Sequence, residues 1–258
     1  ASGFKYGLVG WEMCIRYRVV VAPKSYAYTR EGMLASLERA QRGLGQEVVP
    51  IFLLHEQESS HTLRGHWPAL EVLLEAKEAG IVQAVGISTH HVPAVLAATA
   101  IPEIDVISPL INRTGIGIQG GGREDMLAAI AKAAREGKGI YAMKPLGGGH
   151  LLGEWAASLD YLLQIDEIHS IAVGMKSVAE VESNVAFFQG RRDLPAPAAA
   201  TRRLHIEYWC TGCGSCVSAC PNGSLALHNG RAVVAMPEEC VYCGYCGASC
   251  PEFAIKVI

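Results

Sequence analysis

The sequence predicts an α/β protein with a parallel sheet covered by helices, followed by a small cysteine-rich domain. Three observations indicate this arrangement. Six apolar segments of strand length alternate with helical patterns, eight of the nine cysteines fall between Cys210 and Cys250, and half of the 258 residues are apolar. No uninterrupted apolar run approaches the length of a membrane span, so we expect the apolar residues to form a buried core.

The strand candidates are rich in Val and Ile and apolar on both faces, as strands covered by helices should be. They are residues 19–23, 49–54, 82–88, 104–111, 139–143 and 170–174. The segments between them repeat apolar residues at spacings of three and four, which is typical of a helix with one buried face. These helical segments are 31–43, 66–79, 92–99, 123–137, 155–164 and 178–188. Strict alternation of strand and helix predicts a parallel sheet of about six βα units.

A change in composition divides the chain. We expect a first domain over residues 1–189 and a proline- and alanine-rich linker over 190–203. The segment 204–258 is short, dense in cysteine and poor in helical pattern, so it is expected to form a second, small α+β domain.

The cysteines of this second domain form an internal repeat. The pattern C-x-x-C-x-x-C-x-x-x-C-P begins at Cys210 and again thirty residues later at Cys240. Three thiolates on one tight loop hold one cubane cluster, and the fourth cysteine ligates the other cluster. The predicted ligands of one [4Fe–4S] cluster are therefore Cys210, Cys213, Cys216 and Cys250, and those of the second are Cys240, Cys243, Cys246 and Cys220.

Zinc and disulfides are the alternatives for these cysteines. Zinc sites favour two separated CxxC pairs rather than a triple followed by Cys-Pro. No secretory or transit signal is visible at the N-terminus, so we expect a cytoplasmic, reducing location in which disulfides are rare. The spacing resembles that of bacterial two-cluster ferredoxins across residues 204–258. We therefore expect two [4Fe–4S] clusters in this domain.

The charge balance indicates which partners to expect. The formal net charge is −3, which gives no indication of a nucleic-acid partner. The linker carries arginines at positions 191, 192, 202 and 203. They are interpreted either as a docking patch for an acidic redox partner protein or as an ordinary solvated linker.

Polar residues follow the predicted strands of the first domain at their C-terminal ends, the edge that carries the chemistry in βα barrels. They include Lys24, His55, Ser88, Thr89, Asn112, Met143-Lys144 and Lys176-Ser177. Ser177 opens a helix whose N-terminus could receive a phosphate. The segment 115–120 reads GIGIQG, a literal GxGxxG, but residues 112–114 separate it from the strand and the next strand ends in lysine. We interpret it as an ordinary glycine-rich loop rather than a Rossmann site.

The first domain resembles the aldo/keto reductase family, and specifically members with a C-terminal ferredoxin module. The segments that carry the resemblance are VVVAPKSYAYT, FLLHEQE, AGIVQAVGISTHH, YAMKPLGGGHL and VGMKSVAEVESNV. The resemblance implies a (β/α)8 TIM-barrel fold, NADP(H) as cofactor and hydride transfer between the cofactor and a small-molecule carbonyl or alcohol substrate. The expected function is that of an iron–sulfur oxidoreductase that couples this reaction to electron transfer through the clusters.

The same resemblance implies roles for individual residues. Tyr6, Lys24 and His55 match the proton-donating tyrosine, the lysine and the histidine of the family's catalytic site. A tyrosine with a pKa near 10 is a poor acid unless a nearby cation stabilises the phenolate, which is the role expected for Lys24. The residues that match cofactor contacts are Ser88, Thr89, Asn112, Met143, Lys144, Lys176, Ser177 and Asn184.

Two departures from the family pattern lead to an alternative. Ala1 stands where the family has an aspartate, and the first two strands of an eight-stranded barrel have no counterpart. Six strands cannot close such a barrel, so we interpret this sequence as an N-terminally incomplete version. The alternative is a non-catalytic electron-transfer subunit that uses the degenerate barrel as a docking scaffold.

Overall fold

The computed structural model describes residues 19–175, 177–192 and 203–257. The expectations for Ala1, Tyr6, Lys176 and most of the linker fall outside these residues. The described chain contains one six-stranded sheet, with the strands in sequence order, and two separate two-stranded sheets. The chain divides into two compact units, the first comprising 1–109 and 128–141 and the second comprising 110–127 and 142–258.

The large sheet matches the predicted βα alternation. Its first four pairs of neighbouring strands are parallel. The six strands are β1 (Lys24–Ser25), β2 (Val49–Leu54), β3 (Val82–Thr89), β4 (Val106–Pro109), β5 (Gly139–Met143) and β6 (Ser170–Ala172). Close packing of β3 and β4 requires a glycine, because a Cβ at Gly86 would lie 2.1 Å from the carbonyl oxygen of Val106.

The prediction for the first strand was wrong. Residues 19–23 are not a strand, and β1 begins only at Lys24. The carbonyls of Val21 and Pro23 do accept hydrogen bonds from the N–H groups of β2, at 3.2 and 3.0 Å. Pro23 has no N–H to donate, and the side chains of Val19 and Val20 are exposed. The segment therefore runs along β2 without forming a regular ladder.

The helices agree closely with the helical patterns. They are α2 (Arg30–Leu44), α4 (Trp67–Glu78), α5 (Val92–Thr99), α6 (Arg123–Arg135), α7 (Trp155–Leu163) and α8 (Val178–Phe188). One further helix, α3 (Ser60–Gly65), was not predicted because its sequence SHTLRG has no apolar periodicity. It begins with a capping box, in which Ser59 caps the helix and Thr62 bonds back to the cap. The described chain has no helix long and apolar enough to cross a membrane.

In the first unit, helices bury one face against the sheet. Met33 and Leu37 of α2 and Leu70 of α4 are buried, as is Phe52 of β2. Helix α2 begins at its N-cap Thr29, whose hydroxyl accepts the N–H of Gly32, and ends at Gly45 in the left-handed region. Caps and apolar stripes together explain why these segments form helices at these positions.

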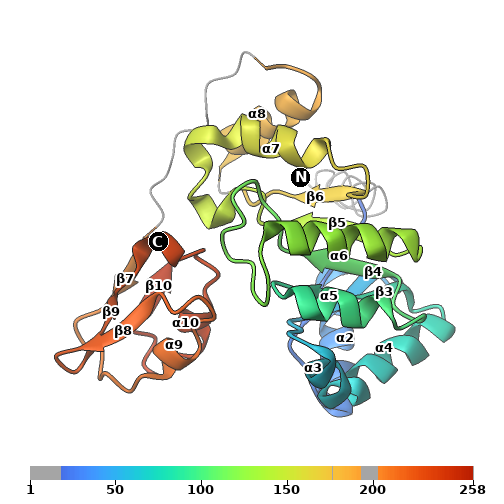
Figure 1. Ribbon diagram of the computed structural model, residues 1–258. Helices are drawn as coiled ribbons and strands as arrows, with labels where there is room; N and C mark the ends of the chain where they lie inside the picture. Colours follow the sequence, from blue (N-terminus) through green and yellow to red (C-terminus); the bar gives the residue numbers. More distant parts are fainter. Residues whose placement is uncertain (1–18, 176, 193–202, 258) are drawn as a thin grey trace, which may run out of the picture. The chain divides into compact units, whose positions relative to one another are not determined.

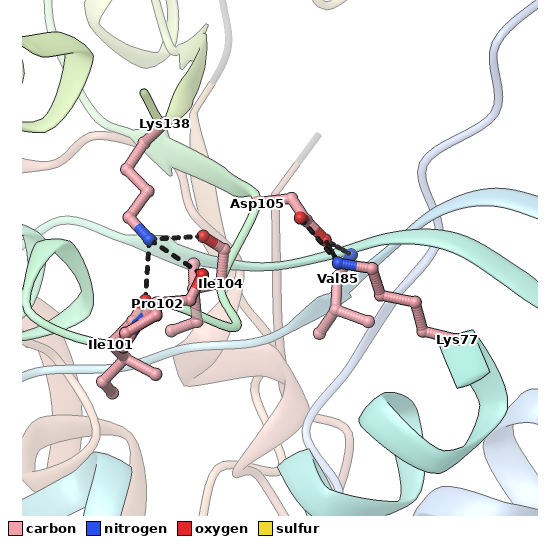
Figure 2. A network of polar contacts seen from close by, with 7 residues as sticks. All are labelled: Lys77, Val85, Ile101, Pro102, Ile104, Asp105 and Lys138. Atoms are coloured by element: carbon pink, nitrogen blue, oxygen red, sulfur yellow. Dashed lines mark hydrogen bonds and ion pairs between the residues drawn. The ribbon is translucent and has the colours of Figure 1, made fainter. Parts of the chain in front are cut away.

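Charged residues stabilise the strands of the first unit at their N-terminal ends (Figure 2). Asp105, just before β4, accepts hydrogen bonds from Lys77 at 2.6 and 2.7 Å and from the N–H of Val85 at 2.8 Å. Lys138, just before β5, donates to the carbonyls of Ile101, Pro102 and Ile104. In βα folds, residues at this end of the strands serve stability, whereas the opposite end carries the chemistry.

The C-terminal part of the second unit is a small α+β domain (orange and red in Figure 1). Strand β7 (Leu204–Ile206) pairs with β10 (Ile255–Val257), and β8 (Leu225–His228) pairs with β9 (Arg231–Val234). The internal repeat is visible in the structure. The short helices α9 (Ser215–Ser218) and α10 (Tyr245–Ala248) each follow a glycine in the left-handed region and carry one buried cysteine, Cys216 or Cys246.

Three short 3-10 segments complete the described elements, η1 (Gly147–Gly149), η2 (Leu152–Glu154) and η3 (Pro237–Glu239). Beside the cysteine-rich domain, the second unit has its own aromatic core, in which the rings of Trp155 and Phe187 lie 5.1 Å apart. This core fixes α7 against α8.

Candidate functional site

In the first unit, the ends of three neighbouring strands bring Lys24, His55 and Ser88 together. The N–H of His55 donates to the carbonyl of Ser25 at 2.7 Å, which fixes the residue immediately after β2. Its ring Nδ1 forms a short hydrogen bond with the hydroxyl of Ser88, a fully buried residue of β3. The imidazole is therefore held in one orientation by a buried neighbour.

Lys24 lies on the face of β1 opposite to α2. The hydroxyl of its neighbour Ser25 donates to Ser36 of α2, so the alternation of side chains along a strand directs Lys24 to the other face. There its ammonium lies 5.6 Å from the ring centroid of Tyr141 on β5. The cation and the aromatic ring attract each other.

Two tyrosines of this site were missed in the sequence analysis. Burial raises the pKa of Tyr141 above its usual value of 10.0. The ring of Tyr26 lies edge-on to the imidazole of His55, with centroids 4.5 Å apart. The strand alternation of GIYAM, which places Tyr141 on the same face as Met143, was a signal that could have identified Tyr141.

Thr89 and its neighbours support the loop after β2. The Thr89 hydroxyl donates to the carbonyl of Gln57 at 2.5 Å and accepts the N–H of His91 at 2.8 Å. Beside it, a carboxylate oxygen of Glu56 accepts a hydrogen bond from the N–H of His90 at 3.0 Å and lies 3.0 Å from the ring Nδ1 of His90, and both side chains are buried. The sequence analysis did not identify this buried pair, which fixes the loop that carries His55.

In the second unit, Asn112 organises its own loop. Its amide nitrogen donates to the carbonyl of Ile116 at 2.9 Å, while its oxygen accepts from the N–H of Gly115 and the hydroxyl of Thr114. Asn112 is fully buried. These hydrogen bonds fix the conformation of the loop over residues 112–118, which contains the first glycines of the GxGxxG match.

A cavity of about 240 Å³ lies at the end of β5 in the second unit. The loop from Lys144 to Leu152 forms one side, and the residues after β6 with Glu180 of α8 form another. Met143 precedes this loop and is buried, and Lys144 has a backbone φ of 57°. The cavity is slightly smaller than the usual range of about 300–1,000 Å³ for small-molecule sites, so it suits one part of a large ligand.

Helix α8 begins beside this cavity. The hydroxyl of Ser177 caps the helix by accepting the N–H of Glu180 at 3.2 Å, and Ser177 is exposed. One turn further on, the buried amide of Asn184 donates to the carbonyl of Glu180 at 2.8 Å. Ser177 is thus available at a helix N-terminus, whereas Asn184 is engaged within the helix.

The structure brings the eight repeat cysteines together in two groups of four. One cavity is lined by Cys210, Cys213, Cys216 and Cys250, and another by Cys220, Cys240, Cys243 and Cys246. These are the two sets that the sequence analysis predicted, each with three cysteines from one repeat and the last from the other. All eight are free thiols. No three metal-binding side chains in the described part of the chain are spaced for a single metal ion.

The surroundings of the thiols differ. Burial raises the pKa of Cys216, and it raises the pKa of Cys246 to about 11. Burial also raises the pKa of Cys240, while the positive charge of Lys144 acts in the opposite direction. The thiol of the exposed Cys213 lies 3.4 Å from the hydroxyl of Ser215, and the hydrogen bond between these two side chains lowers the pKa of Cys213. A bound metal ion or iron–sulfur cluster would stabilise the thiolate form of the buried thiols, whose burial otherwise favours the protonated form.

The fold and these sites combine a TIM-barrel-type βα domain with a small domain that carries two groups of four cysteines. Residues 11–161 match the model of the aldo/keto reductase family, and residues 204–251 match that of a 4Fe-4S dicluster domain. The first match covers more than half of the chain. The chain therefore belongs to the aldo/keto reductase family.

Solved structures of the same fold agree with this assignment. A Pseudomonas aeruginosa protein described as an aldo-keto reductase is 20% identical, with a TM-score of 0.54, and the match covers 65% of each chain. The holo form of the aldo-keto reductase AKR11C1 from Bacillus halodurans is 16% identical, with a TM-score of 0.55, and the match covers 70% of this chain and 69% of that one. At these identities the likeness shows the fold alone. The search of curated proteins found no match.

Proposed function

We propose that this iron–sulfur oxidoreductase binds NADP(H), interconverts a small carbonyl compound and its alcohol, and exchanges electrons through two [4Fe–4S] clusters. The observation that carries the proposal is the grouping of the eight cysteines into two cavities of four. Four thiolates around one cavity are the donor set of a cubane cluster. The residues present thus fit two clusters, with the ligand sets given above.

Features of the β5 cavity support nucleotide binding. Lys144 supplies a cation, and the backbone at Gly148 and Gly149 can approach a ligand without side chains between them. Ser177 is the N-cap of α8, an eleven-residue helix, and a helix N-terminus favours a phosphate. In this proposal Lys176, outside the described residues, and Ser177 contact the 2′-phosphate. Thr89, Asn112, Met143 and Asn184 shape the loops and helix that hold the cofactor.

The catalytic proposal rests on Lys24, His55 and Tyr6. When bound, the nicotinamide supplies the hydride. The ammonium of Lys24 lowers the cost of a phenolate on the proton-donating Tyr6, which lies outside the described residues. His55 orients the substrate oxygen by a hydrogen bond, and its own orientation is fixed by Ser88. Tyr6 and His55 thus contact the substrate in this proposal. Lys24 stabilises the phenolate of Tyr6, and Ser88 orients the ring of His55.

Metal analysis of single-cysteine variants tests the two cluster sites. Anaerobically purified protein should contain about eight irons per chain, four for each cubane. Cys213→Ser and Cys243→Ser should each remove the iron of one site and leave that of the other. Stoichiometric zinc in the wild type, or the same iron content in all three proteins, would contradict the proposal.

The scaffold alternative predicts no nucleotide binding. An anaerobic binding isotherm with NADPH distinguishes the two functions, because a reductase must bind the nucleotide even when its substrate is unknown. Saturable binding of one NADPH per chain supports the enzyme. Absence of binding by cluster-loaded protein supports a docking scaffold.

A further inference from the structure

The segment that carries the second set of cysteines is packed into two glycine loops of the second unit. Val241, which is 3% exposed, lies against Gly117 and Gly148. A Cβ on Gly148 would lie 1.9 Å from the carbonyl oxygen of Val241, and one on Gly117 would lie 2.9 Å from its Cγ1. Both glycines have positive φ. Only glycine provides this backbone conformation and this space together.

His150 holds the same segment at two points. Its ring Nε2 donates a short hydrogen bond to the carbonyl of Cys240. Its ring also stacks on that of Tyr242, with centroids 5.2 Å apart and an angle of 15° between the planes. In a third contact, the side-chain amide of Gln119 donates a hydrogen bond to the side-chain oxygen of Asn222 at 3.2 Å. Asn222 lies two residues after Cys220. These contacts all fall on the segments that carry Cys220 and Cys240.

The docked segment also forms part of the β5 cavity. Val241 and Tyr242 line this cavity together with Lys144, Gly148, Gly149 and Glu180. Tyr242 supplies an aromatic ring and Val241 an apolar surface, and Lys144 and a glycine-rich backbone line the same cavity. An adenosine with attached phosphates combines the matching properties, a flat apolar base and a negative charge.

We propose that residues 240–242, in the segment that carries the second set of cysteines, form one wall of the nucleotide site. In this arrangement Val241 and Tyr242 contact the adenosine–phosphate half of the cofactor. This inference rests on the proposed NADP(H) binding. It goes beyond that function because it makes nucleotide affinity depend on the cysteine-rich domain. Tyr242 lies between Cys240 and Cys243, so occupation of the cavity alters the surroundings of the second cluster.

Binding of 2′,5′-ADP to the cluster-loaded full chain tests the proposal. This compound carries the adenosine and phosphates but no nicotinamide, so it binds without transferring electrons. Tyr242→Ala should weaken its binding roughly fivefold, the loss expected for one aromatic contact. Tyr208→Ala is the matched control, because Tyr208 is an exposed tyrosine of the same domain outside the cavity. The affinity of Tyr208→Ala for 2′,5′-ADP should stay within about twofold of the wild-type value.

A spectroscopic readout on the wild type keeps the test valid if Tyr242→Ala loses its clusters. In dithionite-reduced protein, 2′,5′-ADP should change the EPR signal of one of the two clusters. The same change should persist in Cys213→Ser, which retains the second cluster.

Three outcomes are distinguishable. Weaker binding by Tyr242→Ala with an altered EPR signal supports the wall. If Tyr242→Ala binds 2′,5′-ADP with unchanged affinity and the EPR signal does not change, residues 240–242 do not form a wall of the site. The proposed function is not affected by that result. If the wild type binds neither 2′,5′-ADP nor NADPH, both the proposed wall and the proposed NADP(H)-dependent function are wrong. Where the variant has lost iron, the presence or absence of the EPR change in the wild type decides.

Discussion

At the scale of single residues, Lys24 and His55 are held by different means. A buried serine hydroxyl and a backbone carbonyl fix His55, whereas Lys24 is positioned by strand alternation and by the ring of Tyr141. The charge of Lys24 is thus the part of the site that can be removed with the least disturbance of the fold.

Lys24→Met keeps the apolar stem and removes the charge. We expect kcat/KM for NADPH-dependent reduction, measured with a panel of small aldehydes and ketones, to fall by about 10²–10⁴-fold, because the proton donor loses the cation that stabilises it. Binding of 2′,5′-ADP should remain unchanged. Lys132→Met, on the exposed face of α6, is the control. Wild-type turnover by Lys24→Met would remove Lys24 from the mechanism.

Gly148 offers a second test at this scale. Gly148→Ala places a Cβ against the backbone of Val241 in a backbone conformation with φ of 70°. We expect a loss of about 1–3 kcal/mol in unfolding free energy, with weaker binding of 2′,5′-ADP. Gly153→Ala is the matched control, because no atom lies within 4 Å of the added Cβ and φ is not positive. Equal stability of the two variants would show that the segment does not dock on Gly148.

At the scale of elements, the N-terminal ends of β4 and β5 depend on buried or half-buried charges. The ammonium of Lys138 is surrounded by three carbonyls in a residue that is 6% exposed. Burial lowers the pKa of Lys138 from its usual value of 10.5, while Asp105 and other nearby carboxylates act in the opposite direction.

Lys138→Met should lower the unfolding free energy by about 1–3 kcal/mol at neutral pH, because it removes the ammonium donor from three carbonyls, of which, within the described residues, only that of Ile101 keeps a hydrogen bond from the N–H of Ile104. The pH dependence has a defined sign. Below 10.5 but above the folded-state pKa, the unfolded chain holds a proton that the folded chain has released. The stability of the wild type relative to Lys138→Met should therefore rise with pH in this window. Urea unfolding across the alkaline range measures this difference, and a falling difference would contradict the burial argument.

Elements with a strong pattern were predictable from sequence. Strand β2 and helices α5 and α8 lie where periodicity placed them, because each has a complete apolar face. The first strand was misplaced because Pro23 and exposed valines interrupt a run that looked apolar. Helix α3 depends on a capping box rather than on a buried face, so periodicity could not reveal it.

At the scale of the whole molecule, the cysteine sets were predictable because their spacing encodes which thiols share a cavity. The docking of residues 240–242 on Gly117, Gly148 and His150 was not predictable, since 90 or more residues separate the partners that meet. Each partner alone looks ordinary: a glycine loop, a histidine, or a tyrosine between two ligands. Only the folded chain shows that the β5 cavity and the second cysteine cavity share the segment with Val241 and Tyr242.

We propose that the βα domain and the cluster domain operate as one redox unit. An anaerobic titration of the cluster-loaded protein with NADPH, followed by visible absorbance and EPR, tests it most directly. One NADPH carries two electrons, and each cluster accepts one. We expect NADPH to bleach the clusters and to produce the EPR signals of their reduced forms. Clusters that dithionite reduces, but that NADPH leaves oxidised even though it binds, would contradict it.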